Sequence, residues 1–77
     1  MTIEECFANN LKRFRKENGL TQSELADLSG ISFKYIYKLE TGESNPTIRM
    51  VDILAKTLGV SSISFFLDED GNKVEFD

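Results

Sequence analysis

The sequence predicts one all-α domain of five helices, residues 1–67, followed by a short acidic tail, residues 68–77. Three observations lead to this fold class. Serine or threonine stands before each apolar stretch, as at helix starts. Apolar residues recur at intervals of three and four. Glycines follow several of these stretches, where helices end. Seventy-seven residues allow only one small core, so we expect a single domain.

The first helix should begin at Thr2. Thr2 and Glu5 have the spacing of a capping box, in which each side chain binds the backbone N–H of the other residue. Asn18 and Gly19 then form the expected C-terminal cap. Cys6 falls on the apolar side and should lie in or near the core. The apolar stripe of this helix consists of Ile3, Phe7, Leu11 and Phe14.

Residues 21–41 should form two short helices joined by a tight turn, and the rest of the chain is organised around them. Thr21 and Glu24 repeat the capping box at the start of the second helix. Leu25 and Leu28 are three residues apart, so we expect them on one face.

The turn and the third helix follow at Gly30, where a reversing chain often needs a positive φ. Ser32 is a suitable N-cap. Ile36 and Leu39 form a narrow apolar stripe, and Lys34 and Lys38 should point the opposite way. A plain helical hairpin with a solvated outer face would show the same pattern, since charged outer faces are usual on surface helices.

Two more helices complete the predicted domain. Thr47 caps the fourth, and Gly59 ends it. Its expected core face carries Ile48, Val51, Leu54, Ala55 and Leu58. Ser61 or Ser62 can cap a short fifth helix, in which Ile63, Phe66 and Leu67 share one face.

The tail contains a turn signal at Asp70-Gly71. Beyond it, Val74 and Phe76 alternate with charged residues, a pattern that permits a short strand. The net charge of the chain is −4, and the whole excess lies in this tail, because residues 1–67 hold eight basic and eight acidic side chains. A neutral domain can still present a basic face to phosphates.

The composition argues against an enzyme. The chain has no histidine and one cysteine, so neither a histidine-dependent triad nor an ordinary zinc site can form. We therefore predict no catalytic residue, no metal, no cofactor and no small-molecule partner. Residues 68–72 suggest a calcium loop only faintly, because the glycine comes too early for an EF-hand. The acidic start is no signal peptide and no apolar run could span a membrane, which together with the single cysteine favours the cytoplasm.

Several short motifs, in this order, resemble the lambda-repressor-like (Cro/CI, Xre) helix-turn-helix family over about residues 11–67. They are Gly19-Leu20-Thr21-Gln22, Glu24-Leu25-Ala26, Gly30-Ile31-Ser32 with Ile36, Leu39-Glu40-Thr41-Gly42 and Pro46-Thr47. The resemblance implies a cytoplasmic regulator of transcription, a repressor for example, whose third helix enters the major groove of double-stranded DNA.

The same resemblance implies roles for individual residues. Gln22 would brace on a phosphate and on the third helix. Phe33, Lys34 and Lys38 stand at the base-reading positions, although Phe33 departs from the usual polar residue and could be partly core. Arg15 and Glu40 would form a structural ion pair. The remaining implied DNA contacts are Ser32, Tyr35, Tyr37, Thr41, Ser44 and Asn45.

The end of the domain suggests a homodimer acting on an inverted-repeat operator. Apolar residues crowd the fifth helix beyond what one small core needs, and exposed apolar patches commonly mark interfaces. The predicted interface consists of Ile63, Phe65, Phe66 and Leu67. Residues 45–48 and 60–66 also resemble the autoregulatory controllers of restriction–modification systems. An antitoxin or protein-interaction module using the same fold is the alternative.

Overall fold

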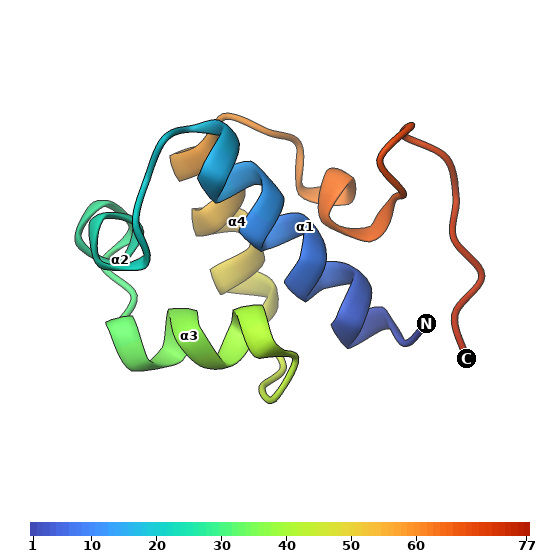
Figure 1. The fold of residues 1–77 in the computed structure, drawn as a ribbon, viewed down its shortest axis with the longest axis horizontal. Helices are drawn as coiled ribbons and strands as arrows, with labels where there is room; N and C mark the ends of the chain where they lie inside the picture. Colours follow the sequence, from blue (N-terminus) through green and yellow to red (C-terminus); the bar gives the residue numbers. More distant parts are fainter.

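The computed structural model describes the whole chain, residues 1–77. Its elements are α1 (Ile3–Glu17), α2 (Gln22–Ser29), α3 (Phe33–Thr41), α4 (Ile48–Leu58) and the 3₁₀ helix η1 (Ser62–Phe66). α1 runs through the middle of the molecule, with α2 and α3 at one end and η1 and the tail at the other (Figure 1). None of the helices combines the length and the apolarity needed to span a bilayer.

The helix ends form as the local sequence predicts. Thr2 and Glu5 exchange hydrogen bonds of 2.9 and 3.1 Å, and Thr21 and Glu24 do the same at 2.9 and 3.0 Å. Gly30 adopts a φ of 73° at the end of α2, a conformation that other residues reach only at a cost. These caps fix where α2 starts and stops, and so fix the turn into α3.

The prediction of five α-helices is wrong, because the last element is a 3₁₀ helix of five residues. Ser61 is its N-cap residue but makes no side-chain cap hydrogen bond, and instead its hydroxyl lies 2.8 Å from that of Ser64. Short 3₁₀ segments are common as connectors. The change of helix type also changes which side chain points inward. Phe65 is fully buried, whereas Ile63 is exposed.

The core lies between all four α-helices and η1. Phe65 fills its centre, with ring centroids 4.9 Å from Phe7 and 5.5 Å from Phe14. Two predicted core positions are wrong. Leu28, expected on one face with Leu25, is 64% exposed. The buried side of α2 is formed by Leu25 and Ala26 instead, so Leu28 lies outside it. The other, Ile48, is 91% exposed at the first position of α4, beyond the edge of the core.

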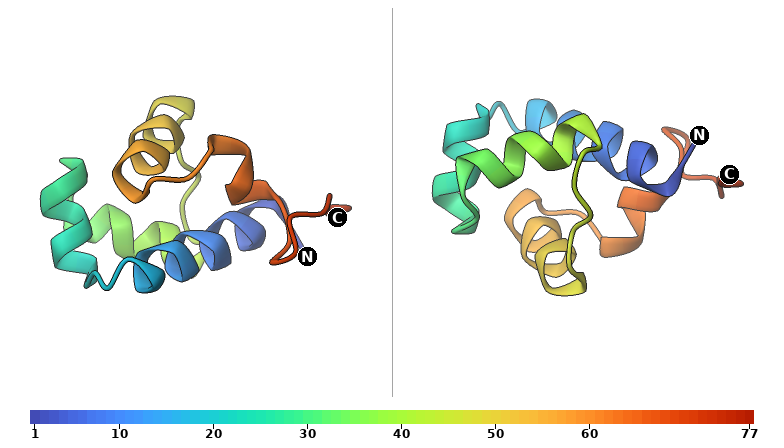
Figure 2. Two further views of the ribbon diagram at one scale, coloured as in Figure 1. Left: turned by 90° about the horizontal axis from the view of Figure 1, so that it is seen from above. Right: turned by 90° about the horizontal axis from the view of Figure 1, so that it is seen from below.

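The tail forms the predicted turn but no strand. The Asp68 carboxylate accepts hydrogen bonds from the backbone N–H groups of Asp70 and Asn72. Only one isolated antiparallel bridge, between Leu67 and Lys73, follows. A strand needs a row of paired residues, and no second pair extends this bridge. The two chain ends lie close together, as the three views show (Figures 1 and 2).

Candidate nucleic-acid interface

α3 presents one side to the core and the other to solvent. Ile36, Leu39 and Glu40 are buried on the inner side, where α3 packs against α1 and α2. α3 lies along the lower edge of the molecule in Figure 1, with no other element beneath it. The outward residues, exposed or half-buried, are Phe33, Lys34, Tyr37, Lys38 and Thr41. The structure therefore brings together on one helix face most of the residues expected to read DNA.

A buried ion pair holds α3 against α1. The guanidinium of Arg15 donates hydrogen bonds of 2.7 and 3.0 Å to the two carboxylate oxygens of Glu40. It donates a third, of 2.8 Å, to the carbonyl of Leu20. Hydrogen bonding to Glu40 raises the pKa of Arg15, so the guanidinium stays charged at any ordinary pH. The pair the resemblance implies is thus present, and its role is to fix the orientation of α3.

Gln22 joins the same network from α2. Its amide Nε2 donates a hydrogen bond of 3.1 Å to Glu40. Gln22 is the first residue of α2, and its side chain is only partly exposed. Its contact ties the start of α2 to the end of α3, which is the bracing expected of it. Its phosphate contact stays a prediction.

The loop between α3 and α4 is held by a tyrosine. The hydroxyl of Tyr35 donates a hydrogen bond of 2.7 Å to the carbonyl of Asn45. This contact ties the loop to α3. Ser44 is half-buried there and Asn45 is exposed, so the side chain of Asn45 remains open to a ligand.

Three further predicted contacts differ in their surroundings. Ser32 uses its hydroxyl oxygen to accept the N–H of Tyr35, which caps α3 and leaves its O–H free to donate. Phe33 is half-exposed at 50%, and Tyr37 is 49% exposed. Phe33 therefore belongs to the surface and not to the core. The binding roles of these residues remain predictions.

The acidic tail does not reach this face. It lies at the end of the molecule opposite α2 (Figures 1 and 2). There the N-terminal ammonium group of Met1 forms an ion pair of 2.9 Å with the side-chain carboxylate of Asp77. The negative charge that dominates the composition is thus kept away from Lys34 and Lys38.

Asn10 is a structural residue that the sequence reading missed. It is 5% exposed, and its amide donates hydrogen bonds of 2.8 Å to the carbonyls of Phe65 and Leu67. Its oxygen accepts a 3.0 Å bond from Arg13. It therefore clamps η1 and the tail to α1. The sequence offers one signal for this role, an asparagine that lies three residues after Phe7, on the apolar side of the first helix. A buried amide needs hydrogen-bond partners, so such a residue is expected to bind a neighbouring segment.

The predicted dimer surface needs correction. Phe65 is fully buried within the chain and offers nothing to a partner, while Phe66 and Leu67 are half-buried. The exposed apolar residues nearby are Ile3, Ile48 and Ile63, at 46%, 91% and 65%. Ile3 and Ile48 line a hollow of about 340 Å³ between α1, α4 and η1, and Ile63 does not line it. The residues that line this hollow are Ile3, Glu4, Phe7, Asn45, Pro46, Ile48, Val51 and Phe66.

Comparison with known proteins matches residues 11–65 to the helix-turn-helix family HTH_3. An uncharacterised HTH-type transcriptional regulator, y4dJ of Sinorhizobium fredii, is 39% identical over 91% of each chain. Control protein C.SmaI of Serratia marcescens is 39% identical over 97% of this chain and 88% of its own. The restriction–modification controller protein C.Esp1396I, solved as a tetramer with its natural 35 base-pair operator, superposes with a TM-score of 0.76. It is 32% identical, over 86% of this chain and 87% of that one.

Proposed function

This chain belongs to the helix-turn-helix family HTH_3, and on that premise we propose that it is a sequence-specific DNA-binding regulator of transcription. The observation that carries the proposal is the outward face of α3. A nine-residue helix is anchored by a buried ion pair and presents outward the exposed Lys34, the half-buried Lys38 and two aromatic rings. The major groove of B-DNA admits one α-helix. A helix with these properties suits that groove.

Lys34 and Lys38 are the proposed base readers. They are one helical turn apart, so both can face the same stretch of groove. Lysine donates to the O6 and N7 acceptors of guanine, and an apolar ring can contact the methyl group of thymine. Phe33 stands at the start of α3 in the right position for such a contact. Tyr37 would reach a base or a sugar.

Phosphate contacts would position the helix without reading sequence. Gln22 at the start of α2 is one proposed donor on one side of α3. The other proposed phosphate contacts, from the N-cap of α3, from α3 and from the loop after it, are Ser32, Tyr35, Thr41, Ser44 and Asn45. Tyr35 and Thr41 already donate their hydroxyl protons to the carbonyls of Asn45 and Lys38, so a phosphate contact from either would replace that bond. The Tyr35–Asn45 hydrogen bond also keeps the loop beside α3, which supports the proposed roles of Ser44 and Asn45.

We further propose a homodimer on an inverted-repeat operator. Ile48 exposes apolar surface at a hollow lined mostly by apolar residues, and Ile63 exposes more on η1, which a second copy could cover in a symmetric interface. Of the predicted interface, Phe66 lines this hollow and Ile63 is exposed on η1, whereas Leu67 lines a different hollow between α1 and the tail. Two recognition helices of a dimer fit DNA when they lie about 34 Å apart, one helical turn. C.Esp1396I, solved as a tetramer with its natural 35 base-pair operator, supports the part of this proposal in which several copies bind one operator.

The finer biological role we propose is autoregulation of a restriction–modification system. The similarity to control protein C.SmaI over 97% of this chain supports it. The same fold serves many regulators, so the operator itself is the sharper test.

The deciding experiment is selection of bound sites from a pool of random DNA duplexes at moderate salt. We expect enrichment of an inverted repeat with half-sites one helical turn apart. The variant Lys34→Ala with Lys38→Ala should lose that enrichment and keep its fold. Failure of the parent protein to enrich any sequence would overturn the proposal and favour the protein-interaction module.

A further inference from the structure

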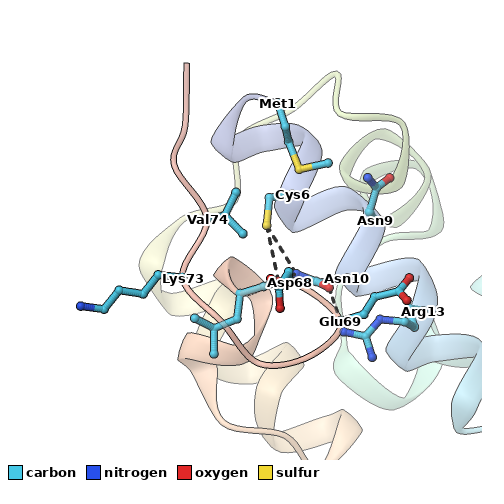
Figure 3. A pocket seen from close by; sticks show the side chains of 10 residues that line it. Met1, Cys6, Asn9, Asn10, Arg13, Asp68, Glu69, Lys73 and Val74 are labelled. Carbon is cyan, nitrogen blue, oxygen red and sulfur yellow. Dashed lines mark hydrogen bonds between the residues drawn. The ribbon is translucent and has the colours of Figure 1, made fainter.

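A second hollow lies between α1 and the tail (Figure 3). It has a volume of about 370 Å³. Its apolar lining comes from Met1, Cys6, Leu67 and Val74, and two carboxylates, Asp68 and Glu69, stand at its rim. Burial raises the pKa of the Cys6 thiol, so this thiol belongs to the apolar lining. The hollow therefore combines an apolar floor with an acidic edge.

The tail beside this hollow has unused backbone groups. Its backbone–backbone hydrogen bonds are Asp68 N–H to the Asn72 carbonyl, 2.9 Å, Gly71 N–H to the Asp68 carbonyl, 3.0 Å, and Asp77 N–H to the Met1 carbonyl, 3.1 Å. The Asp68 carboxylate accepts two more, from the N–H groups of Asp70 and Asn72. Apart from the single bridge beside Leu67, residues 73–76 pair their N–H and C=O groups with no other part of the chain. Unpaired extended backbone is a template for an added strand.

Side-chain exposure in residues 73–76 alternates as in a strand. Val74 and Phe76 are half-buried, whereas Lys73 and Glu75 are exposed. The segment runs along the outer edge of the molecule, with no other element beyond it (Figures 1 and 2). A partner strand could approach from that side without moving a helix.

The charges at this surface select the partner. The tail holds five carboxylates and one lysine, so two copies of it would repel each other. Lys73 also lines the hollow, but its ammonium end extends away from Asn10 and Arg13 (Figure 3). Arg13, which also lines the hollow, is already engaged with Asn10 and Glu17, and Lys12 and Lys16 lie around an adjoining hollow that shares Glu69. Glu69 makes no hydrogen bond or ion pair, so its carboxylate is available.

We propose that α1 and the tail form a docking site for an extended basic segment of a partner protein. The segment adds as a strand beside residues 73–76. One lysine or arginine side chain of the segment enters the hollow, where its aliphatic stem lies on Leu67 and Val74. Its charge faces Asp68 and Glu69. Backbone hydrogen bonds then give affinity and the hollow gives specificity, as in other strand-addition sites. This surface is separate from α3, so the protein could hold DNA and the partner together.

The test uses the full chain and a blocked hexapeptide of alternating lysine and valine, followed by NMR chemical-shift mapping. We expect shifts at the amides of residues 73–76 and at Asn9 and Asn10. The variant Glu69→Gln should weaken binding about two- to fivefold at low salt, the effect of one exposed ion pair. The matched control, Asp27→Asn, removes an exposed carboxylate from α2 and should change nothing.

A second probe carries N-methyl groups on alternate backbone nitrogens and should not bind, because it cannot pair as a strand. Shifts confined to α2 and α3, equal binding of the methylated probe, or equal binding of an alternating glutamate–valine probe would each overturn the proposal. So would self-association of the parent protein that is lost on deleting residues 68–77. Operator binding should survive this deletion, so the test is independent of the proposed DNA-binding function.

Discussion

Arg15 on α1 and Glu40 on α3 form a two-point ion pair inside the protein, with hydrogen bonds of 2.7 and 3.0 Å. Both side chains are buried, at 9% and 4% exposure. A planar guanidinium facing a carboxylate in this way fixes orientation as well as distance. Because Gln22 of α2 binds the same carboxylate, three helices meet at one charged group. The direction of α3 is therefore set by the core and not by its own exposed residues.

Loss of one partner should be costly. We expect Glu40→Ala to lower the free energy of unfolding by about 3–5 kcal/mol, because the buried charge of Arg15 would remain unpaired. Chemical denaturation measures this change directly. The control is Lys56→Ala, which breaks the exposed pair with Asp52 and should cost less than about 1 kcal/mol. Equal effects of the two variants would show that the Arg15–Glu40 pair contributes no more than a surface pair.

Asn10 should be as sensitive as an apolar core residue. Asn10→Asp removes both donated hydrogen bonds and places a carboxylate against the carbonyls of Phe65 and Leu67. We expect a loss of more than about 2 kcal/mol in the free energy of unfolding. Asn9→Asp is the control, since Asn9 is the exposed neighbour, and should change stability by less than about 0.5 kcal/mol. Similar unfolding curves for the two variants would contradict the clamp.

The first capping box should make stability depend on pH. The backbone N–H of Thr2, followed by its hydroxyl, lowers the pKa of Glu5 below its ordinary value of 4.5. The group therefore stabilises the fold above that value, and the contribution is lost as pH falls through the lowered pKa of the folded state. We expect Glu5→Gln to melt below the parent at pH 6, with the difference closing in acid. Glu4→Gln, in the same turn, is the control, and a constant difference at all pH values would refute the prediction.

Sequence reasoning succeeded where the cause was local. Thr21, Glu24 and Gly30 determine the ends of α2 through contacts within a few residues, and the structure confirms them. It failed where the outcome depended on neighbours distant in the chain. Whether Phe65 or Phe66 enters the core depends on the helix type of η1 and on the space between Phe7 and Phe14. The outward direction of Lys34 and Lys38 followed from helical spacing, whereas the DNA-contacting roles of α3 came from the resemblance and stay predictions.

Lys38 should determine which operator variants bind. We expect Lys38→Ala to lose about 1–3 kcal/mol of discrimination at one base pair of each half-site, because a base-edge contact would be missing. Fluorescence anisotropy with single-substitution operators measures this. Lys56→Ala, on the exposed side of α4, is the control and should leave the preferences unchanged. An equal loss of affinity on every operator would make Lys38 a phosphate contact only.

Dimerisation should depend on Ile48 and Ile63 and not on Phe65. Ile48 is 91% exposed and Ile63 is 65% exposed, so glutamate at either position meets only solvent in a single chain and leaves its fold intact. In a symmetric interface, two such carboxylates would be buried near each other without partners, which is strongly unfavourable. Phe65→Glu should instead unfold the chain, because Phe65 lies at the centre of the core.

Sedimentation of the three variants and the parent separates these outcomes. We expect a dimer for the parent and folded monomers for Ile48→Glu and Ile63→Glu, both with weaker operator binding. Leu28→Glu supplies the matched control. Leu28 matches the two isoleucines in size and is also exposed, at 64%. It lies on α2, away from the hollow, so this variant should remain a dimer. A monomeric parent that also fails to dimerise on DNA would refute the interface and, with it, the inverted-repeat operator, because only a two-fold pair of recognition helices requires such symmetry.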